Sequence, residues 1–209
     1  MKKTKVLLTL VCAILLVATS VMGTLAYLTA TTGAVNNTFT VGNVSFDTLN
    51  GELDEAKVDN MGNKVQVEGP NGSKVDAPRV TANEYKLVPG HTYTKDPTVH
   101  IGDNSEDCWL FVKVENGISA IEATGTTTIA AQMTAKGWTP VATGSNIYYY
   151  KTTVSAGDDV VVFESFTLAG TADVSGYANA SITIKAAAIQ ADGFATALEA
   201  WNANSTLLN

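Results

Sequence analysis

The sequence predicts an all-β fold, a jelly-roll-like β-sandwich with short helices. Three observations point to this class. The β-forming residues Val, Thr and Ile recur throughout the chain. Seventeen glycines against five prolines indicate many turns between short strands. About eight segments alternate between apolar and polar residues at short spacing, which is typical of two packed sheets.

The first 26 residues have the pattern of a cleaved secretory signal peptide. Its basic start consists of Lys2, Lys3 and Lys5. The run 6–21 that follows is uncharged and largely apolar. The small residues Thr24 and Ala26 then occupy the positions that a signal peptidase reads, which predicts cleavage between Ala26 and Tyr27.

Two alternatives to this cut stay open. Cleavage after Ser20 also fits the pattern, and a retained anchor is conceivable, although the run 6–21 is shorter than the roughly 20 residues that span a bilayer. After removal of 1–26, ten basic and twenty acidic side chains remain. This acidic excess argues against nucleic acid or an anionic membrane as a partner. No later apolar segment is long enough to cross a bilayer, so no membrane span is expected in the mature form.

Cysteine usage indicates a fold held together by packing alone. Cys108 is the only cysteine of the expected mature chain, so no intrachain disulfide is possible. Its place at the start of an alternating segment predicts a buried and unreactive thiol. Cys12 lies within the signal, without the small preceding residue that a lipoprotein site needs.

The mature chain is expected to consist of an arm, 27–36, and a jelly-roll domain, 37–209. The arm carries no charge, is rich in β-forming residues and becomes an N-terminus only after cleavage. In the following segment, 36–46, the apolar alternation changes phase at Gly42, which indicates a bulge or bend. The β-prone start of the arm consists of Tyr27, Leu28, Thr29, Ala30, Thr31 and Thr32.

The domain itself begins with a polar stretch. Residues 49–78 are rich in charged residues and glycine, which predicts a surface insertion with one short strand at 65–67. Alternation then indicates strands at 84–88 and 91–101, the second at a sheet edge because of its proline. The clearest core strand starts at Cys108, with even-numbered residues on one face and odd-numbered residues on the other.

The C-terminal half alternates between helical and strand patterns. Apolar spacing and a closing glycine indicate a helix at 128–136, and Phe194, Leu198 and Trp201 form the apolar stripe of a second helix. The predicted strands are a hairpin of 138–141 with 147–154, a strand at 160–168 and a strand at 181–191.

The chain lacks the residue patterns of the common enzyme classes. His91 and His100 are the only histidines, and their odd and even positions place them on opposite faces of a strand. The sequence contains no HExxH helix and no Gly-x-Ser-x-Gly elbow. The acidic clusters 103–107 and 158–159 fit solvated turns, with calcium binding left open. We therefore expect no catalytic residue, no metal and no cofactor, and we expect that the protein is not an enzyme.

Several segments together resemble the TasA/camelysin family, in particular its clostridial members. These are secreted Gram-positive proteins processed by a SipW-type signal peptidase. The resemblance covers both ends and the middle of the mature chain, whereas 49–78 matches nothing in the family. The segments that carry it are 24–29, 37–44, 88–99, 105–116 and 188–194.

The resemblance implies a secreted subunit of biofilm matrix fibres with a jelly-roll fold. In such fibres the mature N-terminal segment of one subunit completes a sheet of the next, a donor-strand complementation. The resemblance therefore implies an N-terminal donor strand, which in this chain would be 27–32. The expected partner is therefore another copy of this chain in a head-to-tail homopolymer, outside the cell or on its surface. A requirement for an accessory or anchoring subunit is left open.

Other interpretations remain at this point. The arm could pair within its own domain or stay unpaired. A monomeric cell-surface adhesin or carbohydrate-binding module is the main alternative function, and a metalloprotease is disfavoured because no ligand set can be assembled. An aromatic binding platform would use Trp109, Trp138, Tyr148, Tyr149 and Tyr150.

Overall fold

The computed structural model describes residues 43–47 and 52–208. The predicted signal peptide, the cleavage site at Ala26 and Tyr27, the arm 27–36 and the phase change at Gly42 lie outside these residues. The architecture below is therefore that of the domain alone.

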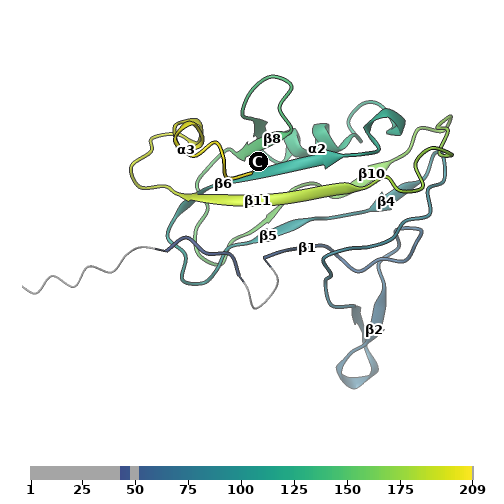
Figure 1. Ribbon diagram of the computed structural model, residues 1–209. Coiled ribbons are helices and arrows are strands. Elements are labelled where there is room, and N and C mark those ends of the chain that lie inside the picture. Colours follow the sequence, from purple (N-terminus) through teal and green to yellow (C-terminus); the bar gives the residue numbers. More distant parts are fainter. Residues whose placement is uncertain (1–42, 48–51, 209) are drawn as a thin grey trace, which may run out of the picture. The chain divides into compact units, whose positions relative to one another are not determined.

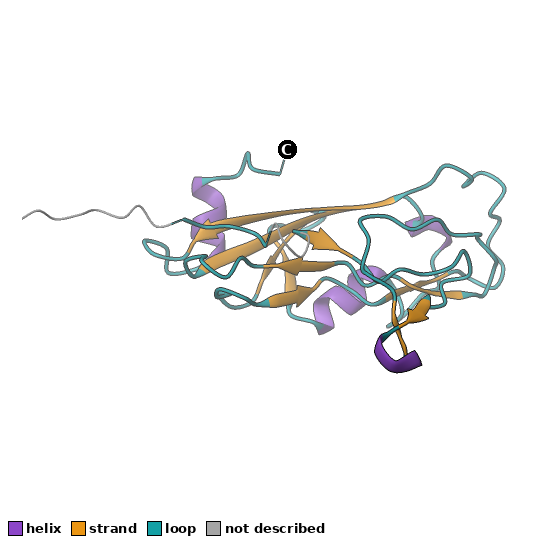
Figure 2. Cartoon of the chain, turned by 90° about the horizontal axis from the view of Figure 1, so that it is seen from below, coloured by secondary structure: helices purple, strands orange, loops and turns teal. Residues whose placement is uncertain are grey.

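Strands dominate the described part of the chain, and its two α-helices are short (Figure 2). This confirms the prediction of an all-β fold with short helices. The helices are α2 (Ile129–Ala135) and α3 (Ala197–Ala203), with 3-10 turns η1 (Pro70–Gly72) and η2 (Ser119–Ile121). The strands are β1 (Leu53–Asp54), β2 (Gln66–Glu68), β3 (Lys74–Asp76), β4 (Thr92–Thr94), β5 (Thr98–His100), β6 (Cys108–Asn116), β7 (Trp138–Pro140), β8 (Ile147–Tyr150), β9 (Asp159–Val161), β10 (Ser165–Thr167) and β11 (Ile182–Gln190).

The strands form two layers (Figure 1). Within the described residues, one layer is an antiparallel sheet in the order β11-β6-β8-β7. Its longest pairing joins β11 to β6 over nine residues of each strand. The other layer contains the sheet β1-β5-β9 and the pair β10-β4. The hairpin of β7 and β8 and the two long strands lie where the sequence predicts them.

The main core lies between these layers. The even-numbered residues of β6 are buried on one side of it, as the alternation predicts. Tyr93 of β4 and Phe166 of β10 stack with ring centroids 4.7 Å apart on the other side. Each fully buried apolar side chain of this size stabilises the fold by about 1.5–3 kcal/mol. Cys108 is fully buried here, and burial, with the charges of Asp107 and Asp158, raises the pKa of its thiol to about 11.

The opposite face of the four-stranded sheet is covered as well. Phe111 of β6 is fully buried there against Trp201 of α3. Thr196 caps α3, because its hydroxyl accepts a hydrogen bond from the Glu199 amide at 3.2 Å. The predicted stripe of this helix was partly wrong: Leu198 is 38% exposed, whereas Ala197 and Ala200 pack inward. Phe194 precedes the helix, which begins at Ala197. The buried face of the helix is therefore formed by Ala197, Ala200 and Trp201 instead of the predicted stripe.

Two predicted strands are each divided in the structure. The segment 91–101 gives β4 and β5, which belong to different sheets and are separated by Pro97. The segment 160–168 gives β9 and β10, again in different sheets. The helix at 128–136 is confirmed as α2, with Thr128 as its N-cap and Gly137, at φ +95°, after its end.

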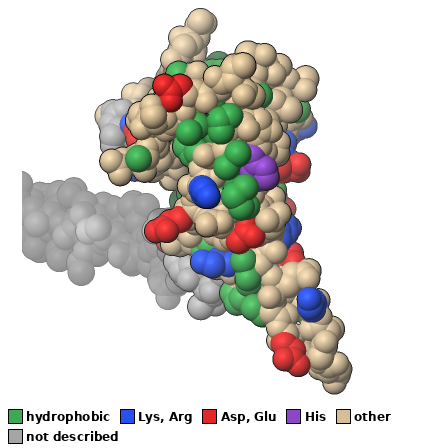
Figure 3. Space-filling model, turned by 90° about the vertical axis from the view of Figure 1, so that its right-hand side faces the viewer, with side chains coloured by type: hydrophobic (Ala, Val, Ile, Leu, Met, Phe, Trp, Pro, Cys, Tyr) green, Lys and Arg blue, Asp and Glu red, His purple; other side chains and the backbone are tan. Residues whose placement is uncertain are grey.

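The charge-rich segment 49–78 is not uniformly a surface feature. Asp54, Glu55, Ala56 and Val58 are buried, and β1 is a strand of the second layer. The later part, 64–78, does project from the domain as the exposed hairpin of β2 and β3 (Figures 1 and 3). The insertion expected from charge is therefore confined to this hairpin.

Candidate functional site

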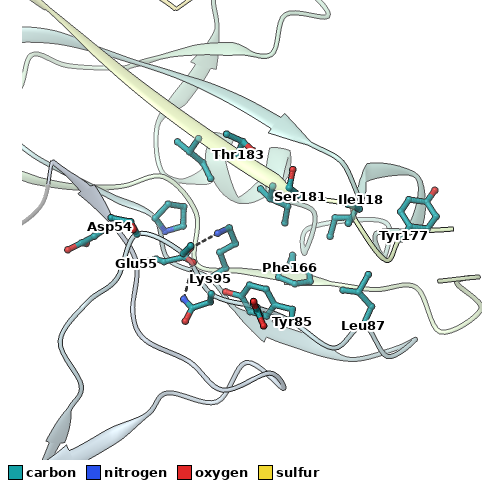
Figure 4. A pocket seen from close by; sticks show the side chains of 18 of the residues that line it. Asp54, Glu55, Tyr85, Leu87, Lys95, Ile118, Phe166, Tyr177, Ser181 and Thr183 are labelled. Atoms are coloured by element: carbon teal, nitrogen blue, oxygen red, sulfur yellow. Dashed lines mark hydrogen bonds and ion pairs between the residues drawn. The ribbon is translucent and has the colours of Figure 1, made fainter. Parts of the chain in front are cut away.

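A groove of about 800 Å³ opens between the N-terminal half of β11 and the segment that includes β1 and residues 81–87. It exposes the space between the two layers. Figure 4 shows Ser181 and Thr183 of the β11 side on one wall, with Glu55 and Lys95 on the other. The apolar lining between them includes Tyr85, Leu87, Ile118, Phe166, Ile182 and Ile184.

Within the residues that the structure describes, the second edge of β11 is unpaired, and its N-terminal half borders this groove. Among these residues the strand pairs with β6 alone. Flanking bonds from the Gly117 amide to the Ser181 carbonyl, 2.9 Å, and from the Ala191 amide to the Asp107 carbonyl, 2.8 Å, show that odd-numbered positions face β6. Backbone groups alternate in direction along an antiparallel strand. The even-numbered residues, such as Ile184 and Ala186, therefore direct their N–H and C=O groups away from β6.

Aromatic rings form the apolar floor of the groove. Tyr85 packs edge-on against Tyr93 and Phe166, with centroid distances of 5.7 and 5.1 Å. Its hydroxyl donates to the Thr94 carbonyl at 3.1 Å. Burial raises the pKa of the Tyr85 hydroxyl well above its ordinary value, and the nearby charges of Glu55 and Asp96 raise it further. Tyr85 therefore remains a neutral hydrogen-bond donor.

A buried polar cluster forms another part of the lining. The Lys95 ammonium makes an ion pair with one oxygen of Glu55, and the Asn83 amide nitrogen donates to the other oxygen at 2.9 Å. The same amide group also donates to the Ala56 carbonyl at 2.9 Å and accepts from the Val58 amide at 3.0 Å. Every polar group of the cluster is thus paired within the chain, as burial requires.

A second polar network lies next to the first and joins β1, β5 and β9. Asp54 accepts from the Arg79 guanidinium at 2.5 Å and contacts His100 Nε2 at 2.9 Å. The other ring nitrogen, His100 Nδ1, lies 2.6 Å from Asp159. Arg79 also donates to Thr98 at 2.8 Å. These contacts tie β1, β5 and β9, the three strands of one sheet in the second layer, together.

This network predicts a pH-dependent stability. Burial lowers the pKa of His100, but hydrogen bonds and charges from Asp54 and Asp159 outweigh it, so its pKa lies above the ordinary 6.5. The stabilisation is complete below the ordinary pKa of histidine and is lost as pH rises through the raised value. We therefore expect thermal stability to fall as the pH rises above the ordinary pKa of histidine, about 6.5. His100→Gln should be less stable by about 1–3 kcal/mol at the acidic end and should show a flatter profile. An unchanged slope in this variant would contradict the assignment.

The structure does not gather the aromatic residues of the predicted platform. Trp138, Tyr148 and Tyr150 pack toward the main core. Trp109 and Tyr149 pack on the opposite face of the same sheet. They therefore do not make one exposed surface.

The two histidines are also separate in their contacts. His91 Nε2 lies 2.8 Å from the Met61 carbonyl, whereas His100 belongs to the network with Asp54. Within residues 43–47 and 52–208, no group of three or more His, Cys, Asp or Glu side chains is arranged to hold a metal. In the same residues, no helix has the length and apolarity to cross a membrane.

Sequence reasoning missed the groove and its polar cluster. Glu55, Asn83 and Lys95 lie far apart in the chain, and each stands in a locally polar stretch. Periodicity carries no signal for such residues, since their burial depends on which segments pack together. The predicted donor-strand residues 27–32 lie outside the described part.

Comparisons with protein-family models, with curated proteins and with solved structures gave no match. The resemblance to the TasA/camelysin family therefore stays a prediction from the sequence segments named above.

Proposed function

We propose that this protein is a secreted structural subunit of extracellular biofilm matrix fibres. In this proposal the arm of one mature subunit, 27–36, enters the groove beside β11 of the next subunit. The observation that carries the proposal is the edge of β11 that is unpaired within the described residues and whose N-terminal half borders the groove. Such an edge accepts a further strand through backbone hydrogen bonds.

The dimensions of the two parts agree. The arm has ten residues, which in extended form span about 33 Å. Strand β11 has nine residues, or about 30 Å. The even-numbered positions of β11 would supply donors and acceptors at the spacing that an added strand needs. The donated strand would extend the four-stranded sheet and complete a jelly-roll-like sandwich.

The chemistry of the arm suits the groove. It carries no charged residue, and the buried charges of the groove are already paired, Lys95 with Glu55 and Asp54 with Arg79. The uncharged side chains of the arm can therefore enter without leaving a buried charge unpaired. Donation from one subunit to the next is a heterologous contact that does not close, so it produces filaments. Signal cleavage would free the arm only on export, which confines assembly to the outside of the cell.

Deletion of residues 27–35 tests the proposal. The secreted protein that lacks them is expected to remain a folded monomer, because the arm contributes to the neighbour's sheet. Electron microscopy should show filaments for the complete mature protein and none for the deletion variant, and light scattering should give a monomeric mass for the variant. Filaments of normal abundance from the deleted protein would overturn the proposal.

A further inference from the structure

Two side chains of the groove, Lys95 and Asn83, meet on the carboxylate of a third, Glu55. Lys95 contacts one oxygen of Glu55, and Asn83 Nδ2 contacts the other at 2.9 Å. Glu55 is 3% and Lys95 is 9% exposed. The amine of Lys95 and the amide of Asn83 therefore lie on the two oxygens of the same buried carboxylate.

The surroundings of the three groups favour a reaction between them. Tyr85 and Phe166 line the groove beside Glu55 and Lys95 (Figure 4), and an apolar neighbourhood strengthens electrostatic effects. The Val58 amide donates to Asn83 Oδ1 at 3.0 Å. This hydrogen bond is in place where negative charge would develop if a nucleophile attacked the side-chain carbonyl of Asn83.

We propose that Lys95 and Asn83 form an intramolecular isopeptide bond, with Glu55 as the catalytic acid and base. Lys95 passes a proton to Glu55, and its neutral Nζ attacks the Asn83 side-chain carbonyl carbon. Glu55 gives this proton to Nδ2 and takes a second proton from Nζ. The carbon–Nδ2 bond breaks and ammonia leaves. The product is an amide between the two side chains and a protonated Glu55, so no oxidant or cofactor is needed.

The bond would remove an electrostatic cost of the folded state. A buried ion pair is held against a large desolvation penalty. The reaction converts Lys95 and Glu55 into a neutral amide and a neutral acid, which hydrogen-bond to each other in the same place. It also joins the segment after β4 covalently to the wall of the groove. The inference does not depend on fibre assembly, because all three residues belong to the described domain.

Mass spectrometry of the purified protein tests the proposal directly. We expect the intact mass to fall below the sequence mass, counted from the observed N-terminus, by one molecule of ammonia. Trypsin digestion of the denatured protein should leave the chain uncut after Lys95. It should yield peptide 80–86 joined to peptide 87–113. Separate peptides 80–86, 87–95 and 96–113, with the full sequence mass, would overturn the proposal.

Variants distinguish the bond from other losses of ammonia. A succinimide at Asn83 would have the same mass, but Lys95 would then remain cleavable, and this result would also contradict the proposal. Lys95→Arg and Glu55→Gln should each have the full sequence mass. Asn83→Asp should lose water in place of ammonia and give a product identical to that of the natural sequence. Because the natural protein alone decides the outcome, poor folding of a variant does not weaken the test.

Discussion

A proline in place of Ala186 is expected to abolish filament formation while the subunit itself stays folded. Ala186 lies in β11 at an even-numbered position, so its N–H points away from β6, toward the edge where an added strand would pair. Proline removes that donor and places its ring where an added strand would lie. It is tolerated at sheet edges, so the pairing with β6 should survive. Electron microscopy measures the filaments, and circular dichroism measures the fold.

Ala186→Val is the matched control for this variant. Valine adds bulk but keeps the N–H and favours a strand, so filaments should form. The proline variant still carries its own arm and should add to a growing end without accepting a further subunit. A small fraction of it mixed with the natural protein should therefore shorten the filaments. Filaments of normal length from the pure proline variant would show that β11 is not the acceptor.

Trp138→Ala is expected to cause the largest loss of stability among single core substitutions. Trp138 is 1% exposed, its indole N–H donates to the Val161 carbonyl at 3.2 Å, and its ring lies 5.1 Å from that of Tyr150. Truncation leaves a cavity and an unpaired carbonyl, which together cost about 3–5 kcal/mol. Urea unfolding followed by circular dichroism measures this difference.

Trp109→Ala provides the comparison for the core variant. Trp109 is only partly buried, on the face covered by α3, and its indole N–H makes a long bond of 3.4 Å to the Phe194 carbonyl. Its removal should therefore destabilise the protein much less than that of Trp138. Equal losses for the two variants would contradict the assignment of Trp138 to the main core.

Much of the fold could be predicted from local patterns. Alternation identified β6 and β11 and assigned Cys108 to a buried face, because one side of each strand packs against the main core. The helix α2 was equally clear, since Thr128 caps it and Gly137 follows it. These signals are local. They predicted the structure correctly because the faces that are apolar in the sequence are the faces that pack in the core.

The sequence predictions were wrong where the burial of a residue depends on contacts with segments far away in the chain. Asp54 and Glu55 read as surface residues, yet Arg79, His100 and Lys95 neutralise them inside the domain. Likewise, nothing local in 160–168 reveals that the chain passes from one sheet to another between β9 and β10. The groove depends on the edge of one sheet and the packing of another, so its residues share no sequence pattern.

The projecting hairpin of β2 and β3 is a suitable place for a label that reports how subunits are arranged in a fibre. Its tip, Pro70–Gly72, is exposed and includes Asn71 and Gly72 at φ 62° and 73°. Exposed tips of this kind tolerate inserted sequence, because no buried backbone bond is broken. An epitope or a gold-binding peptide placed between Asn71 and Gly72 would mark every subunit once. The spacing of the labels along a fibre would then give the axial repeat. The direction in which successive labels wind around the fibre axis would give the hand of its helix.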